Sequence, residues 1–173
     1  MGTLIGRALD GWRAPLLLAV GAVGVLGAAL FMQHVVGVQP CALCVYQRWP
    51  YVIAGGLALL TLAFGRRRPV RAGLLGLIGL VLLGDTCLAV FHVGVEYHWW
   101  VGLSGCSVEP AATLDELRAR LLDGPVVPCD EVSWSLFGVS LAGYNVVVTL
   151  ALAAFALLAA RRALQPKGRN NVV

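Results

Sequence analysis

The stretch Gln39–Pro50, QPCALCVYQRWP, is the part of this chain that says most about its fold and its chemistry. It carries two cysteines in CxxC spacing, Cys41 and Cys44, and Arg48 follows four residues after the second cysteine. An apolar segment ends just before this stretch and another begins within it. A paired thiol is reactive and an arginine beside a membrane is energetically costly, so both residues call for a functional explanation.

The composition is that of a membrane protein. The chain has 173 residues, a mean hydropathy of +0.82 and only 13% charged residues, too few for the surface of a soluble globule. About 20 apolar residues cross the hydrocarbon core of a bilayer. We therefore predict an all-α bundle of four transmembrane helices in a single membrane domain, residues 1–173, with spans at 14–33, 45–64, 71–93 and 138–160. The second span reaches this length only when it is extended back to Val45.

A signal peptide is the alternative interpretation of the first apolar stretch, because Arg7 and Arg13 precede it and small residues follow near Ala29. The apolar run is long for the core of a signal peptide. Cleavage near Ala29 would also leave an odd number of spans that disagrees with the distribution of charge. We therefore expect the first stretch to be a transmembrane helix.

The basic residues predict the orientation, because cytoplasmic flanks of membrane helices collect Lys and Arg. Ten of the thirteen basic residues lie before the first span, between the second and third, or after the fourth. We therefore expect both termini and the loop at 65–70 to be cytoplasmic, with outward loops at 34–44 and 94–137. The pI near 9.0 reflects this asymmetry and does not indicate nucleic-acid binding.

Four of the five cysteines fall in the predicted outward loops, where disulfides persist. Cys41 and Cys44 lie at the end of the first loop, Cys106 and Cys129 lie in the second, and Cys87 is alone inside the third span. Two structural disulfides are the simplest explanation. However, a CxxC ring is so small that it restrains the unfolded chain little, and this spacing is typical of oxidoreductases.

The cysteines could also bind a metal ion or a haem. Four cysteines suit a zinc ion, but Cys106 and Cys129 lack the second CxxC of a zinc ribbon. A c-type haem site needs a histidine after the second cysteine of the pair, where this chain has Val45. We therefore expect no metal.

Two features near Cys44 favour a thiolate. Pro40 precedes the cysteine pair as it would at the start of a helix, whose positive end stabilises an anion. On a continuous helix Arg48 would share a face with Cys44 and stabilise its thiolate. Pro50 weakens this argument because it would kink or delay the helix. Alternatively, Arg48 extends to the membrane interface.

At this point the sequence resembles the bacterial disulfide bond formation protein B (DsbB) family, the inner-membrane quinone reductases that reoxidise the periplasmic thiol oxidase DsbA. The resemblance rests on PCALCVYQRWP, on FHVGVEYHWWVGLSGCS at the exit of the third span, and on CDEVSWSLFGVSLAGYN before the fourth. It covers the chain from the first span to about Asn145. The four outward cysteines, with their positions in the loops, make it specific.

The resemblance implies a relay of two cysteine pairs. Cys106 and Cys129 would form an outer disulfide that accepts electrons from DsbA through Cys106. Cys41 and Cys44 would form an inner disulfide, with Cys44, Arg48 and His92 beside a ubiquinone or menaquinone. Each thiol/disulfide couple carries two electrons, as many as reduce a quinone to a quinol. A relative of vitamin K epoxide reductase is the rival enzyme, but there we would expect the CxxC late in the chain.

The second outward loop contains a predicted amphipathic helix. Thr113 and Glu116 form a capping box, and Leu114, Leu117 and Leu121 share one apolar face. We expect this helix to lie in the membrane interface.

The tryptophans near the outward ends of the spans are typical of an interfacial aromatic belt. One of them could instead stack on a quinone. They are Trp49, Trp99, Trp100 and Trp134.

Three titratable residues of the third span share one stripe of a helix, because Asp85, His92 and Glu96 are spaced by 7 and 11 residues. An acid inside a membrane usually faces the bundle interior and marks function. We hypothesise that His92, with Glu96, supplies protons to the reduced quinone. For Asp85 we prefer the simpler interpretation, a protonated acid hydrogen-bonded to another helix.

Overall fold

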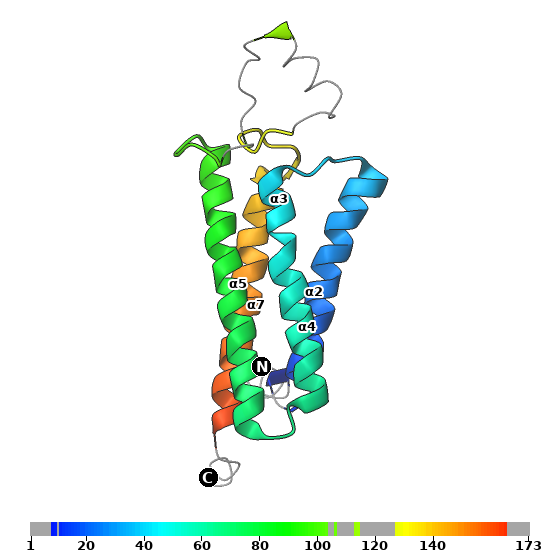
Figure 1. Cartoon of the computed structure of the whole chain (residues 1–173), viewed down its shortest axis with the longest axis vertical. Coiled ribbons are helices and arrows are strands. Elements are labelled where there is room, and N and C mark those ends of the chain that lie inside the picture. The colour runs from blue at the N-terminus through cyan, green and yellow to red at the C-terminus, as the bar shows by residue number, and fades with distance from the viewer. Residues whose placement is uncertain (1–7, 10, 104–105, 107–112, 115–126, 166–173) are drawn as a thin grey trace.

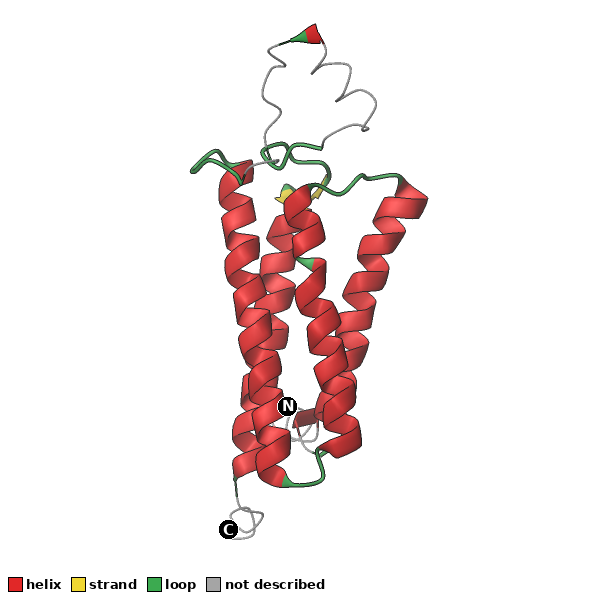
Figure 2. Ribbon diagram, viewed as in Figure 1, coloured by secondary structure: helices red, strands yellow, loops and turns green. Residues whose placement is uncertain are grey.

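The computed structural model describes residues 8–9, 11–103, 106, 113–114 and 127–165. Four long helices run side by side through most of it (Figure 1). They are α2 (Arg13–Phe31), α4 (Arg48–Phe64), α5 (Arg68–Glu96) and α7 (Leu141–Leu164). A π-helical turn, η1 (Met32–Val36), extends α2, and the short helix α3 (Ala42–Tyr46) precedes α4. Figure 2 shows that helices make up almost all of the regular structure.

Three segments of the described chain are long and apolar enough to cross a membrane, namely Arg13–Val36, Arg68–Glu96 and Leu141–Leu164. They coincide with the first, third and fourth predicted spans. Their outer faces expose large apolar side chains, including Leu80 and Val147, which are 62% and 66% exposed. Such faces suit contact with lipid.

The second predicted span differs from the structure, because the helix is interrupted at Gln47. Helix α3 ends at Tyr46, and α4 has 17 residues. Pro50 explains the interruption, since it has no N–H to donate to the carbonyl of Tyr46 four residues earlier. The proline itself is accommodated in the first turn of α4. The predicted span 45–64 therefore contains the last residues of α3, the break at Gln47 and all of α4.

Helices α5 and α7 pack along their length through small residues. A Cβ atom added at Gly79 would lie 2.6 Å from Leu157 Cγ, so α5 needs a glycine there. Alanines of α7, such as Ala153 and Ala156, are fully buried opposite. Small side chains let helix backbones approach closely, which is how helices associate within a membrane.

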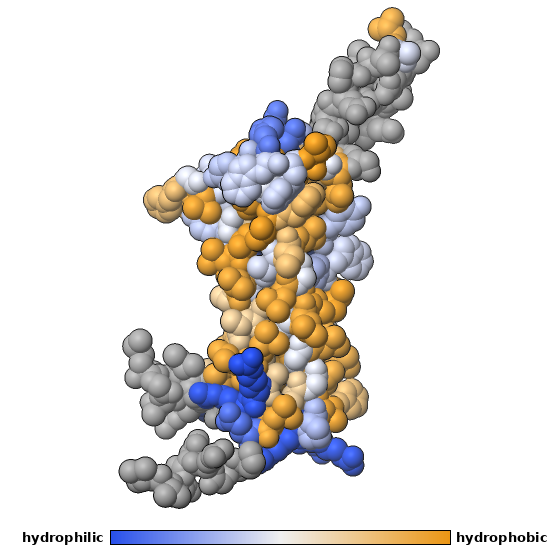
Figure 3. All heavy atoms as spheres, turned by 90° about the vertical axis from the view of Figure 1, so that its left-hand side faces the viewer, coloured by the Kyte–Doolittle hydropathy of each residue, from blue (hydrophilic) through white to orange (hydrophobic). Residues whose placement is uncertain are grey.

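The two ends of the bundle differ in chemistry. Figure 3 shows an apolar middle and strongly hydrophilic residues gathered at both ends. At one end lie the start of α2, the α4–α5 turn with its arginines, and the end of α7 (Figure 1). At the other end lie α3, η1 and the segments that carry Cys106 and Cys129. The two cysteine pairs and most of the arginines are thus at opposite ends.

The described part of the second outward loop adds one small sheet to the predicted all-helical fold. Strands β1 (Ser135–Leu136) and β2 (Val139–Ser140) pair antiparallel, and Phe137 and Gly138 make the turn with φ of 51° and 79°. Positive φ at both turn positions is typical of tight hairpins. The predicted amphipathic helix lies outside the described residues except for Thr113 and Leu114.

Candidate functional site

The CxxC pair lies where the chain turns into α3. Cys41 is the N-cap residue of α3, and its sulfur accepts a hydrogen bond from the backbone N–H of Cys44 at 3.2 Å. The two sulfur atoms are 2.8 Å apart, and both residues are free cysteines rather than the disulfide that the family resemblance implies. Cys41 is buried and Cys44 is half-buried. The pair therefore holds two thiols in contact with each other.

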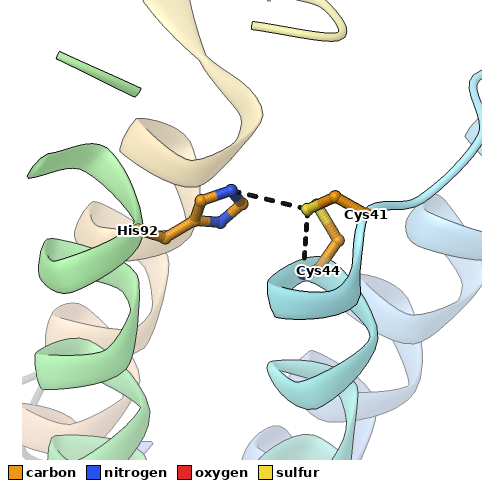
Figure 4. Close-up of side chains that lie close together, drawn as sticks. All are labelled: Cys41, Cys44 and His92. Carbon is orange, nitrogen blue, oxygen red and sulfur yellow. Dashed lines mark hydrogen bonds between the residues drawn. The ribbon is translucent and has the colours of Figure 1, made fainter. Parts of the chain in front are cut away.

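His92 brings α5 to the cysteine pair. Its Nε2 atom is 3.5 Å from the Cys41 sulfur, and the imidazole points toward that sulfur across the gap between the helices (Figure 4). His92 is 3% exposed. The contact joins residues that lie 51 positions apart in the sequence. A buried imidazole beside a thiol is an arrangement that can hold or transfer a proton.

The surroundings favour a thiolate at Cys41. The hydrogen bond from the Cys44 side chain lowers the pKa of the Cys41 thiol, and His92 lowers it further, so that it falls from 9.0 to about 4 although burial opposes this. The same contact, together with burial, raises the pKa of the Cys44 thiol. Cys41 also accepts the backbone N–H of Cys44, so the proton shared by the pair belongs on Cys44. The sequence pointed to a thiolate at Cys44, whereas these contacts favour one at Cys41.

Arg48 lies beyond the interruption of the helix at Gln47, so the continuous helix assumed for its interaction with Cys44 is not present. Its guanidinium donates a hydrogen bond to Gln33 Oε1 of η1 at 2.7 Å. Arg48 nevertheless lines the same cavity as Cys44. Its position therefore suits an interaction with a molecule in that cavity better than with the thiol itself.

The cavity has a volume of about 280 Å³ and lies among α2, α4 and α7, beside the cysteine pair. Val25, Leu26 and Ala29 of α2 supply an apolar wall. Polar groups that line the cavity include both thiols and the side chains of Arg48, His92, Glu96 and Asn145. An apolar wall with a few convergent polar groups is typical of a small-molecule site.

A chain of hydrogen bonds leads from His92 toward the centre of the bundle. Gln47 Nε2 lies 3.1 Å from His92 Nδ1, and Gln47 Oε1 accepts a hydrogen bond from Asn145 Nδ2 at 2.8 Å. Asn145 Nδ2 also donates to Asp85 Oδ2 at 3.2 Å, and Asn145 Oδ1 accepts from the Tyr51 hydroxyl. Helices α4, α5 and α7 are therefore joined by one buried polar network.

The second cysteine pair, Cys106 and Cys129, forms a disulfide, which is the pairing implied by the resemblance. Cys129 N–H also donates to the carbonyl of Cys106 at 2.8 Å. Both cysteines are almost completely buried, and they belong to the same apolar cluster as Cys41, Leu43 and Val95. The two cysteine pairs are therefore packed into one cluster at this end of the bundle.

The disulfide also bears on the zinc site considered from the sequence. Cys106 and Cys129 are bonded to each other, so their sulfurs are not free thiolate ligands in this arrangement. Within the described residues, the ligand atoms of Cys41, Cys44 and His92 lie within 4.8 Å of one another, a spacing that would also suit a metal ion.

The remaining predicted residues divide between this site and its surroundings. Asp85 and His92 are buried, and Glu96 accepts a hydrogen bond from Ser140 at the start of α7. Of the tryptophans, Trp134 lines the cavity, whereas Trp100 stacks on Phe91 and donates to its backbone carbonyl. Cys87, alone inside the third span, is an exposed free cysteine on α5.

Sequence reasoning missed Gln47, Tyr51 and Asn145. Each is a polar residue within or beside an apolar stretch, which is the signal that singled out Asp85. Gln47 and Tyr51 lie near the CxxC motif and Asn145 within the quoted fourth-span segment. No spacing rule connects them, because they come from separate helices.

Comparison with known proteins gives a consistent result. The family model described as "Disulfide bond formation protein DsbB" matches residues 12–159. Disulfide bond formation protein B of Azoarcus sp. is 31% identical over 158 residues, 84% of this chain and 90% of the relative. The protein of the same name from Aromatoleum aromaticum is 29% identical over 78% of this chain and 83% of its own. Disulfide bond formation protein B 1 of Pseudomonas aeruginosa is 28% identical over 83% of this chain and 90% of its own.

Proposed function

Because this chain belongs to the DsbB family of disulfide bond formation proteins, we propose that it reoxidises a periplasmic thioredoxin-like thiol oxidase of the DsbA type and passes the electrons to a membrane quinone. One observation carries the proposal. The disulfide Cys106–Cys129 and the free pair Cys41 and Cys44 share a buried cluster, and the free pair lines a largely apolar cavity. The two ends of a relay are thus within one compact site.

The membrane arrangement that goes with this function has four spans in the bacterial inner membrane. Residues 45–64 form the second span, since α4 together with the preceding turn reaches the roughly 20 residues that cross the hydrocarbon core. The arginine-rich end faces the cytoplasm with both termini, and the two cysteine pairs face the periplasm, in line with the charge bias of membrane proteins. Oxidising conditions on the periplasmic side preserve disulfides.

The outer disulfide takes two electrons from the partner. A thiolate of the reduced partner attacks the Cys106 sulfur, the Cys106–Cys129 bond breaks, and the second partner thiol resolves the mixed disulfide. The partner leaves as a disulfide, and Cys106 and Cys129 keep two electrons and two protons. Both cysteines are buried in the described arrangement, so Cys106 must become accessible when the partner binds.

The outer dithiol then reduces the inner pair by the same exchange. A thiolate from the outer pair attacks the Cys41–Cys44 disulfide, forms a transient bond between the pairs, and is displaced when its own partner cysteine attacks. The products are an outer disulfide and an inner dithiol. In this combination the electrons are on the pair beside the cavity.

The cavity residues suit a quinone, ubiquinone or menaquinone. Cys44, Arg48 and His92 would hold the polar ring at one end, and the apolar side chains of α2 would contact the isoprenoid side. A bound quinone supplies an acceptor for two electrons and two protons, which the dithiol releases as it becomes a disulfide. The Cys44 thiol carries one of these protons. His92, with Glu96, delivers the other.

Quinone reduction by the purified protein in detergent tests this function, with a reduced thioredoxin-like oxidase as electron donor. We expect steady turnover that Cys44→Ser abolishes, because the inner pair can no longer form a disulfide. Cys87→Ser is the matched control, since Cys87 is exposed on α5 and lies outside both pairs. If the wild-type protein does not reduce ubiquinone or menaquinone, the cysteines are structural and the proposal fails.

A further inference from the structure

The hydrogen-bond network beneath the cysteine pair has a direction. Asn145 Nδ2 donates to both Asp85 Oδ2 and Gln47 Oε1, and this leaves Gln47 Nε2 to donate to His92 Nδ1. His92 Nδ1 is then an acceptor, so the proton of the neutral imidazole is on Nε2, which faces the Cys41 sulfur. The orientation of the Asn145 amide therefore determines that of the Gln47 amide, which in turn determines the tautomer of His92.

The same atoms could be joined with the opposite direction. If the oxygen and nitrogen of both side-chain amides were exchanged, Asn145 Oδ1 would accept a hydrogen bond from Gln47 Nε2. Gln47 Oε1 would then accept a hydrogen bond from His92 Nδ1–H. His92 Nε2 would then present a lone pair to Cys41, which would disfavour a thiolate there. Tyr51 does not choose between the two arrangements, because a hydroxyl both donates and accepts.

Asp85 does choose between them. This holds for the ionised acid, in place of the protonated acid preferred from the sequence. A carboxylate oxygen accepts hydrogen bonds and cannot donate, so a turned Asn145 would place its oxygen against Asp85 Oδ2. Asp85 is 1% exposed, and its Oδ1 atom is buried without a hydrogen-bond partner among the described residues. An apolar residue would avoid that cost, so packing alone does not explain an acid at this position.

We propose that Asp85 is a positioning residue that fixes the direction of the Asn145–Gln47–His92 hydrogen-bond chain and thereby holds the His92 proton on Nε2, facing Cys41. The importance of this for turnover rests on the proposed function. The hydrogen-bond arrangement itself does not depend on a quinone or on a partner. Asp85 acts through three other side chains and does not line the cavity.

The consequence lies at Cys41. An N–H group directed at a sulfur stabilises the anion and leaves the neutral thiol unfavoured. With the direction fixed, Cys41 faces two N–H donors, namely His92 Nε2–H and the Cys44 backbone N–H. Asp85 thus helps to keep a buried thiolate at Cys41, one of the two sulfurs of the inner pair.

Nitrogen NMR of the reduced protein in detergent, labelled with 15N-histidine, tests the inference. The nitrogen shifts report which ring nitrogen carries the proton, and the His92 signals are identified by their loss in His92→Leu. We expect the wild-type protein to carry the proton on Nε2. Asp85→Asn keeps the size of the side chain but lets it donate, so we expect a second form with the proton on Nδ1, at roughly a tenth of the population or more.

Two further variants keep the test decisive. Thr86→Val is the matched control, because Thr86 is the next residue of α5 and bonds to Leu82 O and Thr149 rather than to the hydrogen-bond chain. We expect it to leave the His92 signals unchanged. Gln47→Glu places an acceptor-only oxygen at His92 Nδ1, so we expect that nitrogen to become protonated.

Two results would overturn the inference. One is a wild-type His92 with its proton on Nδ1, and the other is an Asp85→Asn spectrum identical to that of the wild-type protein. No quinone or donor enters this measurement, so it is separate from the turnover test. An absent turnover with the expected spectra would reject the proposed function alone. Normal turnover with unaltered Asp85→Asn spectra would reject the role of Asp85 alone.

Discussion

The two halves of the α5–α7 pair have the same helical packing but different interiors. In the arginine-side half, residues 68–84 and 150–164, every buried residue is apolar. On α5 these are leucine, isoleucine, alanine and glycine, and on α7 they are all alanine. In the cysteine-side half, residues 85–96 and 141–149, the buried residues include Asp85, His92 and Thr149. Both halves are described in full by the structure.

This difference separates what holds the bundle together from what gives it a function. Apolar contacts and close backbones stabilise helix pairs without further requirements, and the arginine-side half needs nothing else. Buried polar groups add cost unless each has a partner, and in the cysteine-side half they converge on Cys41. Substitutions in the two halves should therefore affect different measurements.

The largest effect is expected for His92→Leu, which removes the imidazole at Cys41. Turnover with a reduced thiol oxidase and quinone should fall by about 100-fold or more, because general acid–base catalysis typically contributes 10²–10⁴-fold. The apolar replacement should keep the protein folded. The pKa of Cys41, which is about 4 in the intact site, should rise while staying below 9.0, since the contact with Cys44 persists.

The pH dependence provides the direct measurement. A thiolate is lost as the pH falls through its pKa, so the thiolate absorbance of the reduced wild-type protein should persist to near pH 4, with Cys41→Ser as the blank. In His92→Leu the loss should occur at higher pH. Unchanged turnover and an unchanged titration would show that His92 is a packing residue. The buried residues of both halves would then serve packing alone.

The arginine-side half is tested by a matched pair of glycine substitutions. A Cβ atom at Gly79 would lie 2.6 Å from Leu157 Cγ, whereas one at Gly76 meets nothing within 4 Å. Both changes gain the same helix propensity, so the difference between them isolates the overpacking. We expect Gly79→Ala to be less stable than Gly76→Ala by about 1–3 kcal/mol.

Unfolding in detergent measures this difference, and turnover per folded molecule serves as the second readout. We expect turnover per folded molecule to be the same in both variants, because neither glycine is near the two cysteine pairs. Equal stabilities would mean that Leu157 moves aside at little cost. A loss of turnover at full stability would mean that the arginine-side half contributes to chemistry.

Hydropathy was sufficient to predict the positions of α2, α5 and α7, because long apolar runs report burial in lipid directly. It was not sufficient at the second span, where the helix is interrupted at Gln47, between Cys44 and Arg48. The i, i+4 argument assumed a continuous helix. The interruption of that helix depends on one missing backbone N–H, that of Pro50.

The candidate site was predictable only where its residues are close in sequence or match the family pattern. Cys41 and Cys44 are identified by their spacing, and His92 by the family resemblance. The contact between His92 and Cys41 and the link through Asn145 join three separate segments, and nothing local encodes them. Asp85 stood out as an acid in an apolar run, but its partner on α7 could not be read from the stripe that it shares with His92.

The smallest expected effect concerns Ser140, a polar residue at the edge of the cysteine-side half. Its hydroxyl accepts the Gly143 N–H at 3.1 Å as the N-cap of α7 and donates to Glu96. Ser140→Ala should lower the free energy of unfolding by about 1 kcal/mol, the usual value of such a cap, and Ser140→Thr should restore most of it. Denaturant unfolding in detergent measures both. If Ser140→Ala instead kept its stability and lost turnover, the hydroxyl would act through Glu96 on the proton supply, and the functional half would extend to the first residue before α7.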